Sequence, residues 1–134
     1  MTAATPIIVV VDDSAAVRVF FEKITSNLGV DLRTYASAAE AMDFLAERQP
    51  DLLFLDIIMP DKDGLTFLQE LRRIPLHVAT PTIVISSKDY AQDRNTARAL
   101  GVVEYMPKPM TSKALQEAII KYTAPPAAPP PARA

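Results

Sequence analysis

Residues 52–64 read LLFLDIIMPDKDG, and this stretch decides the fold. Its first four residues are a short apolar run, typical of a strand buried on both faces, and the run ends at Asp56. After Gly64, apolar residues recur at helical spacing, namely Leu65, Leu68 and Leu71. This helix must stop before Pro75, because proline lacks the backbone donor that a helix interior requires. The stretch therefore predicts a strand, a loop and a helix, with an acidic residue at the carboxyl end of the strand.

Other apolar runs along the chain have the same character. Residues 7–11 and 82–86 are short, bounded and rich in branched side chains, and residues 102–106 are a weaker example. Residues 32–35 form a further brief run with the right propensity for a strand. Segments with helical periodicity separate these runs. The alternation predicts right-handed crossovers and an α/β fold, a three-layer sandwich of five β/α units.

Capping residues predict where the helices begin and end. Ser14 suits the N-cap of the first helix, which we expect to extend through Leu28 to a closing Gly29 in the left-handed conformation. Residues 37–40, SAAE, form a capping box that begins the second helix. Asp89 is expected to cap the fourth helix. Because the apolar stripe of that helix is thin, we expect it to be the most weakly held helix.

Bulk composition sets the class of protein. The chain has 134 residues, a formal net charge of -2 and no cysteine. This length suits one domain with a proper core, and the lack of cysteine excludes disulfides and thiolate zinc sites. The net charge is slightly negative and the sequence has no run of Lys and Arg, so it lacks the positive charge that binds nucleic acid or an anionic membrane. We therefore expect a cytoplasmic protein with no direct contact to nucleic acid and no membrane segment.

The composition changes abruptly at residue 124. Residues 124–134 read APPAAPPPARA. Such a segment lacks the side chains needed to bury an apolar face and favours an extended, polyproline-like chain. We therefore expect a folded domain over residues 1–123, followed by a Pro/Ala-rich disordered tail or linker over residues 124–134.

Residues able to handle phosphate or a metal follow four of the predicted strands: Asp12 with Asp13, Asp56, Ser86 and Lys108. The carboxyl ends of parallel strands lie along one edge of a sheet, where open α/β folds bind ligands. Two adjacent acids after a strand, taken alone, are more often a turn and a helix cap than a metal site, and Asp56 alone is ambiguous in the same way. Together, two like charges about 4 Å apart repel by about 4 kcal/mol at an effective dielectric constant of about 20. The cluster therefore requires a cation beyond Lys108, and Mg²⁺, which binds carboxylates and bridges to phosphate, suits it.

The ordered set of motifs resembles a known family. Residues 12–14 (DDS), 56–64 and 108–109 (KP) together are similar to the receiver domain of two-component response regulators, the family of the chemotaxis protein CheY. The resemblance covers residues 7–122, nearly everything except the tail. It implies a flavodoxin-like parallel sheet of five strands in the order 2-1-3-4-5, in agreement with the alternation of strands and helices.

The resemblance implies a role for each acid. Asp56 would be the phosphoacceptor, and its donor would be a phosphohistidine on a sensor histidine kinase or on a phosphotransfer protein. Asp13 would ligate Mg²⁺ directly and Asp12 largely through water. Asp56 and the backbone carbonyl of Ile58 would complete the protein ligands, and Mn²⁺ would be an alternative ion. An ionised carboxylate attacks phosphorus without a general base, so positioning and charge neutralisation are nearly all that the transfer requires.

The resemblance also implies residues that contact and report the phosphoryl group. Lys108 would pair with it, Ser86 would hydrogen-bond to it, and Tyr105 would rotate from an exposed to a buried position. The Lys108–Pro109 peptide bond would be cis. The residues flanking the phosphoryl group would be Ile58, Ser87 and Lys88. Because an apolar side chain does not orient water, Ile58 predicts a comparatively long-lived phosphoryl state.

The switch formed by Ser86 and Tyr105 would alter binding of a downstream protein on the face of the fourth helix, the fifth strand and the fifth helix. The chain would act as a monomer or as a dimer formed on phosphorylation. It would be no enzyme beyond its own phosphorylation and dephosphorylation. His77, the only histidine of the chain, would be a loop residue at the opposite end of the sheet from Asp56.

Two alternatives stay open at this point. A Mg²⁺-dependent phosphohydrolase of the haloacid dehalogenase type also forms an aspartyl-phosphate, but it places two acids two residues apart after one strand and usually has a cap domain. In this chain the paired acids, Asp12 and Asp13, are adjacent. The other alternative is a pseudo-receiver that binds partners without phosphorylation, for which an incomplete acidic set would argue.

Overall fold

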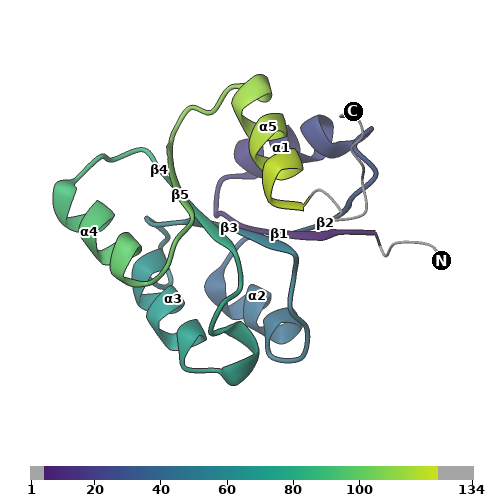
Figure 1. Ribbon diagram of the computed structural model, residues 1–134. Helices are drawn as coiled ribbons and strands as arrows, with labels where there is room; N and C mark the ends of the chain where they lie inside the picture. Colours follow the sequence, from purple (N-terminus) through teal and green to yellow (C-terminus); the bar gives the residue numbers. More distant parts are fainter. Residues whose placement is uncertain (1–4, 124–134) are drawn as a thin grey trace, which may run out of the picture.

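The computed structural model describes residues 5–123, and the structural statements below refer to these residues; the predicted tail, residues 124–134, lies outside them. Strands and helices alternate along the chain, as the sequence predicts (Figure 1). The strands are β1 (Ile7–Val11), β2 (Asp31–Tyr35), β3 (Leu52–Asp56), β4 (Thr82–Ser86) and β5 (Glu104–Pro107). The helices are α1 (Ala15–Thr25), α2 (Ala38–Leu45), α3 (Gly64–Arg72), the 3-10 helix η1 (Pro75–His77), α4 (Ala91–Ala99) and α5 (Ser112–Thr123). Within residues 5–123, none of the helices has the length and apolar character needed to cross a membrane.

The five strands form one parallel sheet in the order β2-β1-β3-β4-β5. Val11 of β1 lies opposite Tyr35 of β2 and Leu55 of β3, and Asp56 lies opposite Ile85 of β4. Helices α1 and α5 cover one face of the sheet, and α2, α3 and α4 lie on the other side (Figure 1). The three-layer α/β sandwich with strand order 2-1-3-4-5 is therefore confirmed.

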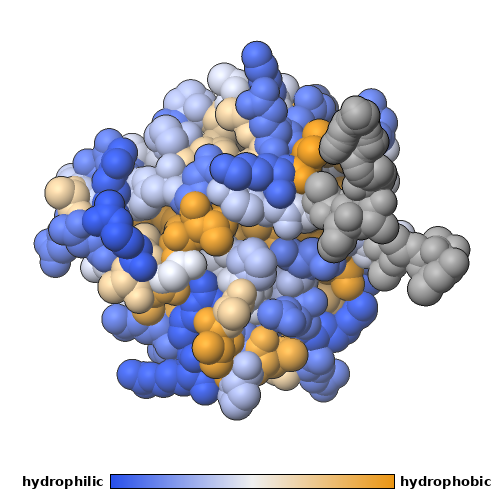
Figure 2. Space-filling model, in the orientation of Figure 1, coloured by the Kyte–Doolittle hydropathy of each residue, from blue (hydrophilic) through white to orange (hydrophobic). Residues whose placement is uncertain are grey.

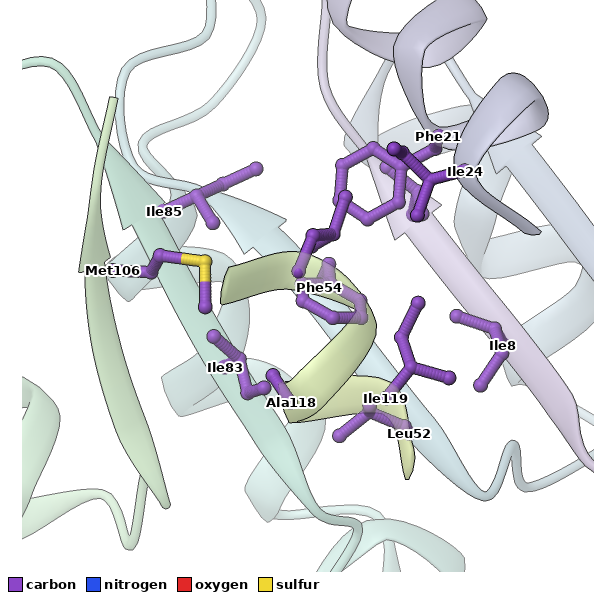
Figure 3. Packing of buried hydrophobic residues seen from close by; sticks show 12 residues of the cluster. Ile8, Phe21, Ile24, Leu52, Phe54, Ile83, Ile85, Met106, Ala118 and Ile119 are labelled. Carbon is purple, nitrogen blue, oxygen red and sulfur yellow. The ribbon is translucent and has the colours of Figure 1, made fainter. Parts of the chain in front are cut away.

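Apolar layers on both faces fix the sheet. Successive side chains of a strand point to opposite faces, so Ile8 packs towards α1 and α5 while Val9 packs towards α2 and α3. In the first layer the rings of Phe21 and Phe54 meet edge to face, with centroids 4.8 Å apart (Figure 3). Every residue of β3 and β4 is buried. These two interior strands therefore give the residues at their carboxyl ends a fully buried base.

Helix α1 is shorter than the sequence predicts, because it ends at Thr25 and not at Leu28. The hydroxyl of Ser26, which directly follows the helix, donates to the carbonyl of Lys23 at 2.9 Å. Such a side-chain hydrogen bond competes with the continuing helical ladder. A turn follows, and Gly29 adopts the predicted left-handed conformation with a φ of 71°.

The prediction that Asp89 caps α4 is wrong. The N-cap is Tyr90, which makes no side-chain hydrogen bond, and the carboxylate of Asp89 binds Arg94. Two charge-assisted hydrogen bonds to a guanidinium outweigh a single bond to a backbone amide. Strand β5 also begins later than predicted, at Glu104, because the amide of Val102 still bonds to a carbonyl of α4.

His77 is fully buried in η1, which the prediction of a loop histidine missed. Its Nδ1 lies 2.8 Å from Oγ1 of Thr80, and its Nε2 contacts the carbonyl of Leu45. The side chain of Arg72 donates to the carbonyls of His77 and Thr80 in the same cluster. Because η1 precedes β4 and Asp56 ends β3, His77 lies at the opposite end of the sheet from Asp56, and it has a structural role there.

Candidate functional site

The carboxyl edge of the sheet brings together polar residues that are distant in sequence. Asp12 follows β1, Asp56 ends β3 and Lys108 follows β5. One carboxylate oxygen from each of Asp12, Asp13 and Asp56 lies within 4.8 Å of the others. Asp12 and Asp56 are buried and Asp13 is exposed. The three predicted acids therefore form one cluster with an open side towards solvent.

Lys108 lies between the two buried acids. Its Nζ is 2.9 Å from Oδ2 of Asp12 and 3.4 Å from Oδ1 of Asp56. The other oxygen of Asp12 accepts a hydrogen bond from the amide of Ser14 at 2.9 Å, and Arg18 donates to the backbone carbonyl of Asp12 at 2.8 Å. The start of α1 thus holds Asp12 in place against Lys108.

The local electrostatics keep Lys108 charged and make Asp56 harder to ionise. Burial raises the pKa of Asp56 to about 6, and the charge of Asp12 adds to this rise while Lys108 opposes it. Burial acts to lower the pKa of Lys108, but its hydrogen bonds and charge interactions with Asp12 and Asp56 outweigh burial and raise that pKa. One ammonium against two buried carboxylates leaves the cluster with an excess of negative charge.

The cluster fits a hard divalent cation. Oδ2 of Asp12 is buried and, apart from its ion pair with Lys108, has no hydrogen-bond partner of good geometry within residues 5–123. The three acids offer only carboxylate oxygens, the ligands that Mg²⁺ prefers, and the exposure of Asp13 leaves room for the waters that Mg²⁺ retains. The donor set therefore suits the predicted metal.

The predicted switch residues, Ser86 and Tyr105, are connected through the loop between β4 and α4. Ser86 is buried, and its hydroxyl accepts a hydrogen bond from the amide of Lys88 at 3.0 Å. The carbonyl of Lys88 in turn accepts a hydrogen bond from the hydroxyl of Tyr105 at 3.0 Å. The ring of Tyr105 is half-buried, and burial raises the pKa of its phenol. One residue of this loop thus contacts both predicted switch residues.

The residues predicted to flank the phosphoryl group are on the surface. Ile58 is 49% exposed, and Ser87 and Lys88 are also exposed. Ser87 lies with Lys108 in the lining of one hollow. The Lys108–Pro109 peptide bond is cis, and the amide of Lys108 donates to the carbonyl of Ser86 at 2.8 Å.

Gly64 supports the site in a way that sequence reasoning missed. Its amide donates to the carbonyl of Ile57 at 2.7 Å, and a Cβ at this position would lie 2.0 Å from the backbone oxygen of Asp56. Asp63 caps α3, because its carboxylate accepts hydrogen bonds from the amides of Leu65 and Thr66 in the first turn of the helix. An Asp-Gly pair ahead of an apolar helix was the available signal for the cap. The close packing of α3 on the backbone of Asp56 had no such signal.

A mainly apolar hollow of about 460 Å³ opens beside the acid cluster. It lies between the start of α1 and the segment that joins β5 to α5. Its lining consists of Ala16, Val17, Phe20, Ser87, Lys108, Pro109 and Met110. Because Lys108 both lines the hollow and contacts Asp56, a group seated there would lie next to the cluster.

Comparisons of the sequence identify relatives over nearly the whole described chain. The family model of the response regulator receiver domain matches residues 8–120. Protein PilG of Pseudomonas aeruginosa is 31% identical over 112 residues, which are 84% of this chain and 83% of PilG. Response regulator MprA of a Mycobacterium species is 31% identical over 121 residues, covering 88% of this chain and 52% of MprA. NtrC of Escherichia coli K12 is 32% identical over 103 residues, covering 77% of this chain and 22% of NtrC. The chain thus spans most of PilG but about half of MprA and a fifth of NtrC.

Solved structures share the fold. CheY4 of Vibrio cholerae has a TM-score of 0.82 at 21% identity, covering 89% of this chain and 99% of that chain. The receiver domain of the sensor histidine kinase PA1611 of Pseudomonas aeruginosa has a TM-score of 0.78 at 22% identity, covering 89% and 98%, and it contains a magnesium ion coordinated in its active site cleft. At such identities these structures show the fold alone. The family model and PilG both match most of this chain. The chain therefore belongs to the family of response regulator receiver domains.

Proposed function

We propose that this receiver domain accepts a phosphoryl group on Asp56 from a phosphohistidine of a sensor histidine kinase or of a phosphotransfer protein. The observation that carries the proposal is the grouping of three carboxylates around the ammonium of Lys108 at the carboxyl edge of the sheet. The chain acts as a signalling phosphoacceptor, and its own phosphorylation and dephosphorylation are the only reactions that it promotes.

The transfer needs an ionised Asp56. Its pKa of about 6 leaves it mostly ionised at neutral pH. One carboxylate oxygen of Asp56 forms a bond to phosphorus while the P–N bond to the donor histidine breaks, and the histidine nitrogen keeps the electron pair. Lys108, whose Nζ lies 3.4 Å from Asp56, pairs with the phosphoryl oxygens and neutralises part of their charge. The site requires no general base, because the attacking carboxylate carries no proton.

Mg²⁺ would be held by Asp12, Asp13, Asp56 and the backbone carbonyl of Ile58. Mn²⁺ would be an alternative ion at the same site. When bound, the ion supplies positive charge to the phosphoryl oxygens as the transfer proceeds. The contribution of the chain itself is to fix the acids. The carboxylate of Asp12 is fixed by the amide of Ser14, which supports this assignment.

The hollow beside Lys108 would receive the phosphoryl donor. Its apolar lining, which includes Val17, Phe20 and Met110, suits apolar side chains on a helix of the donor protein. Docking there would bring a donor histidine towards Asp56, because Lys108 contacts Asp56 from the wall of the hollow. The same surface would disfavour docking of other donor proteins whose side chains around the histidine do not fit the hollow.

Phosphorylation would be transmitted through Ser86 and Tyr105. The hydroxyl of Ser86 would leave the amide of Lys88 and donate to the phosphoryl group. Because Lys88 also accepts the hydrogen bond from Tyr105, loop and ring would move together. The resulting change in the face of α4, β5 and α5 would alter binding of a downstream protein, with the domain as a monomer or as a dimer formed on phosphorylation.

The two alternatives from the sequence are not favoured. A phosphohydrolase of the haloacid dehalogenase type needs an acid two residues after its nucleophile, and the residue at that position after Asp56 is Ile58. A pseudo-receiver is expected to lack part of the acidic cluster, and here all three acids are present. We retain residues 1–123 as the receiver domain and residues 124–134 as a tail or linker.

Phosphorylation of Asp56 is tested by intact mass after incubation with acetyl phosphate. We expect one added phosphoryl group in the presence of Mg²⁺ and none in chelator. The Asp56→Asn variant should show no adduct, because an amide does not attack phosphorus. The matched control is Asp43→Asn, which removes an exposed acid on α2 and should behave like the parent. An adduct that persists in Asp56→Asn would assign the acceptor to another residue.

Replacing Ile58 with asparagine should shorten the life of the phosphoryl group. The side chain is 49% exposed at the rim of the site, and an amide there would orient an attacking water, whereas isoleucine does not. We expect the first-order decay of the adduct, followed by mass or by phosphate release, to become several-fold faster. Ile120→Asn makes the same substitution at a 55% exposed position on α5 and should leave the decay unchanged. Equal decay of the parent and Ile58→Asn would contradict the role of Ile58.

A further inference from the structure

Arg94 of α4 lies against the predicted switch residue Tyr105. Its guanidinium carbon is 5.3 Å from the centroid of the tyrosine ring. Two of its nitrogens also donate to the two carboxylate oxygens of Asp89, which precedes the N-cap of α4. A bidentate pair with a carboxylate restricts an otherwise flexible arginine side chain. Asp89 therefore holds the cation of Arg94 beside the ring.

Tyr105 is held at its hydroxyl end as well. The hydroxyl donates to the carbonyl of Lys88 at 3.0 Å, and the amide of Lys88 donates to the hydroxyl of Ser86 at 3.0 Å. A continuous set of contacts therefore runs from the end of β4 to α4, through Ser86, Lys88, Tyr105, Arg94 and Asp89. Any movement of Ser86 towards Asp56 acts on a tyrosine that is restrained at both its hydroxyl and its ring.

Helix α4 is attached more firmly at one end than at the other. It lies at the outer edge of the molecule beside β5, and hydrophilic residues cover much of it (Figures 1 and 2). At its start the N-cap, Tyr90, makes no side-chain hydrogen bond, and Ala97 is the buried residue of the helix. At its other end Arg72 donates to the carbonyl of Leu100 at 2.9 Å. The half that carries Arg94 therefore lacks the buried residue and the hydrogen bond from Arg72 that hold the other end.

We propose that Arg94, held by Asp89, is a positioning residue that keeps Tyr105 in its resting conformation and so sets how readily the domain switches. This inference rests on the proposed phosphoacceptor function and adds the residue that tunes it. Reaction at Asp56 and movement of Tyr105 are linked equilibria, so a contact present only in the resting conformation disfavours both. A cation over an exposed aromatic face is strong enough to change the ratio of two conformations by about two- to fivefold.

The test follows Tyr105 directly. The chain has four tyrosines, so 3-fluorotyrosine gives few ¹⁹F signals, and Tyr105→Phe assigns the one that matters. In Arg94→Gln without phosphorylation, the Tyr105 signal should move towards the position that it takes in the parent after treatment with acetyl phosphate and Mg²⁺. The rate constant for phosphorylation by acetyl phosphate should rise by about threefold, in line with the strength of the contact.

Three further variants separate this contact from a simple change of charge. Arg98→Gln removes the same charge one turn further along α4, where the guanidinium bonds to Asn95, and should change neither measurement. Asp89→Asn should act like Arg94→Gln, and the double variant should go no further than either, because the two residues work as one unit. Arg94→Lys keeps the cation without the bidentate pair and should restore part of the parental behaviour.

Two outcomes would overturn the inference. One is an unchanged Tyr105 signal in Arg94→Gln; the other is equal effects of Arg94→Gln and Arg98→Gln, which would leave only net charge as the cause. If the parent takes up no phosphoryl group at all, the proposed function fails on its own. The ¹⁹F comparison of resting proteins still decides whether Arg94, held by Asp89, positions Tyr105. A shift of the Tyr105 signal confined to the Arg94 and Asp89 variants supports that contact.

Discussion

The Gly64→Ala variant is expected to lose stability and phosphoryl transfer together. A Cβ at Gly64 would lie 2.0 Å from the backbone oxygen of Asp56 and 2.9 Å from the Cα of Ile57. Both atoms belong to the backbone of a buried strand and its exit, so neither yields as a flexible side chain would. Overpacking usually costs about 1–3 kcal/mol, and a backbone clash places this variant at about 3 kcal/mol.

Transfer should suffer beyond the loss of stability. Relief of the clash requires α3 and the backbone of Asp56 to separate, which displaces the carboxylate from Lys108, now 3.4 Å away. A misplacement of about 1 Å lowers the rate of a positioned reaction by about a hundredfold. Urea unfolding measures the first effect, and the rate of adduct formation on the folded fraction measures the second.

Gly29→Ala is the matched control for Gly64→Ala. Gly29 has a φ of 71°, so alanine there is strained, but a Cβ meets nothing within 4 Å. We expect a loss of about 1–2 kcal/mol from the left-handed conformation and an unchanged rate of phosphorylation. Gly64→Ala could instead be as stable as Gly29→Ala and be phosphorylated at the parental rate. That result would show that α3 does not support Asp56 as described.

The sequence allowed prediction of the parts of the fold that depend on local pattern. Strands β1 and β4 lie where their branched runs predict them, and Ser37 caps α2 as the capping box requires. Helix α1 ended early because a hydroxyl competed for a helical carbonyl, as Ser26 does. Propensity alone does not rank such competing hydrogen bonds.

The rest of the site depends on contacts between distant segments. Asp89 looked like a cap because its partner, Arg94, becomes the better choice only once the helix has formed. The closeness of Gly64 to Asp56 follows from how α3 packs on the end of β3, and no periodicity encodes that distance. Spacing in the sequence thus predicted which residues lie close together at the site. Their distances and hydrogen-bond partners could be read only from the structure.

The Asp56→Asn variant is expected to be more stable than the parent in chelator at neutral pH. Burial and the nearby charge of Asp12 raise the pKa of Asp56 from 3.8 to about 6, so the folded state binds this proton more tightly than the unfolded state does. At about 1.4 kcal/mol per pKa unit, the difference corresponds to about 3 kcal/mol of destabilisation once the carboxylate is ionised. A neutral side chain of the same shape removes that repulsion and desolvation.

The direction of the pH dependence follows from the same linkage. Well below pH 3.8 Asp56 is protonated in both states of the parent, so parent and variant should unfold at similar urea concentrations. Between pH 4 and pH 6 the parent loses stability relative to the variant as pH rises, because the folded state holds more protons than the unfolded state. Well above pH 6, where Asp56 is ionised in both states, the gap should be constant at about 2–3 kcal/mol, which allows for incomplete hydrogen bonding of the buried amide.

Two comparisons identify the cause of this gap. Asp13→Asn should stabilise the chain by less than about 1 kcal/mol, because Asp13 is exposed and its charge is screened by solvent. Addition of Mg²⁺ should narrow the gap between Asp56→Asn and the parent, because ion binding stabilises the folded state of the parent. A gap of the same size at pH 4 and at pH 7.5 would show that packing, and not the ionised carboxylate of Asp56, separates the two proteins.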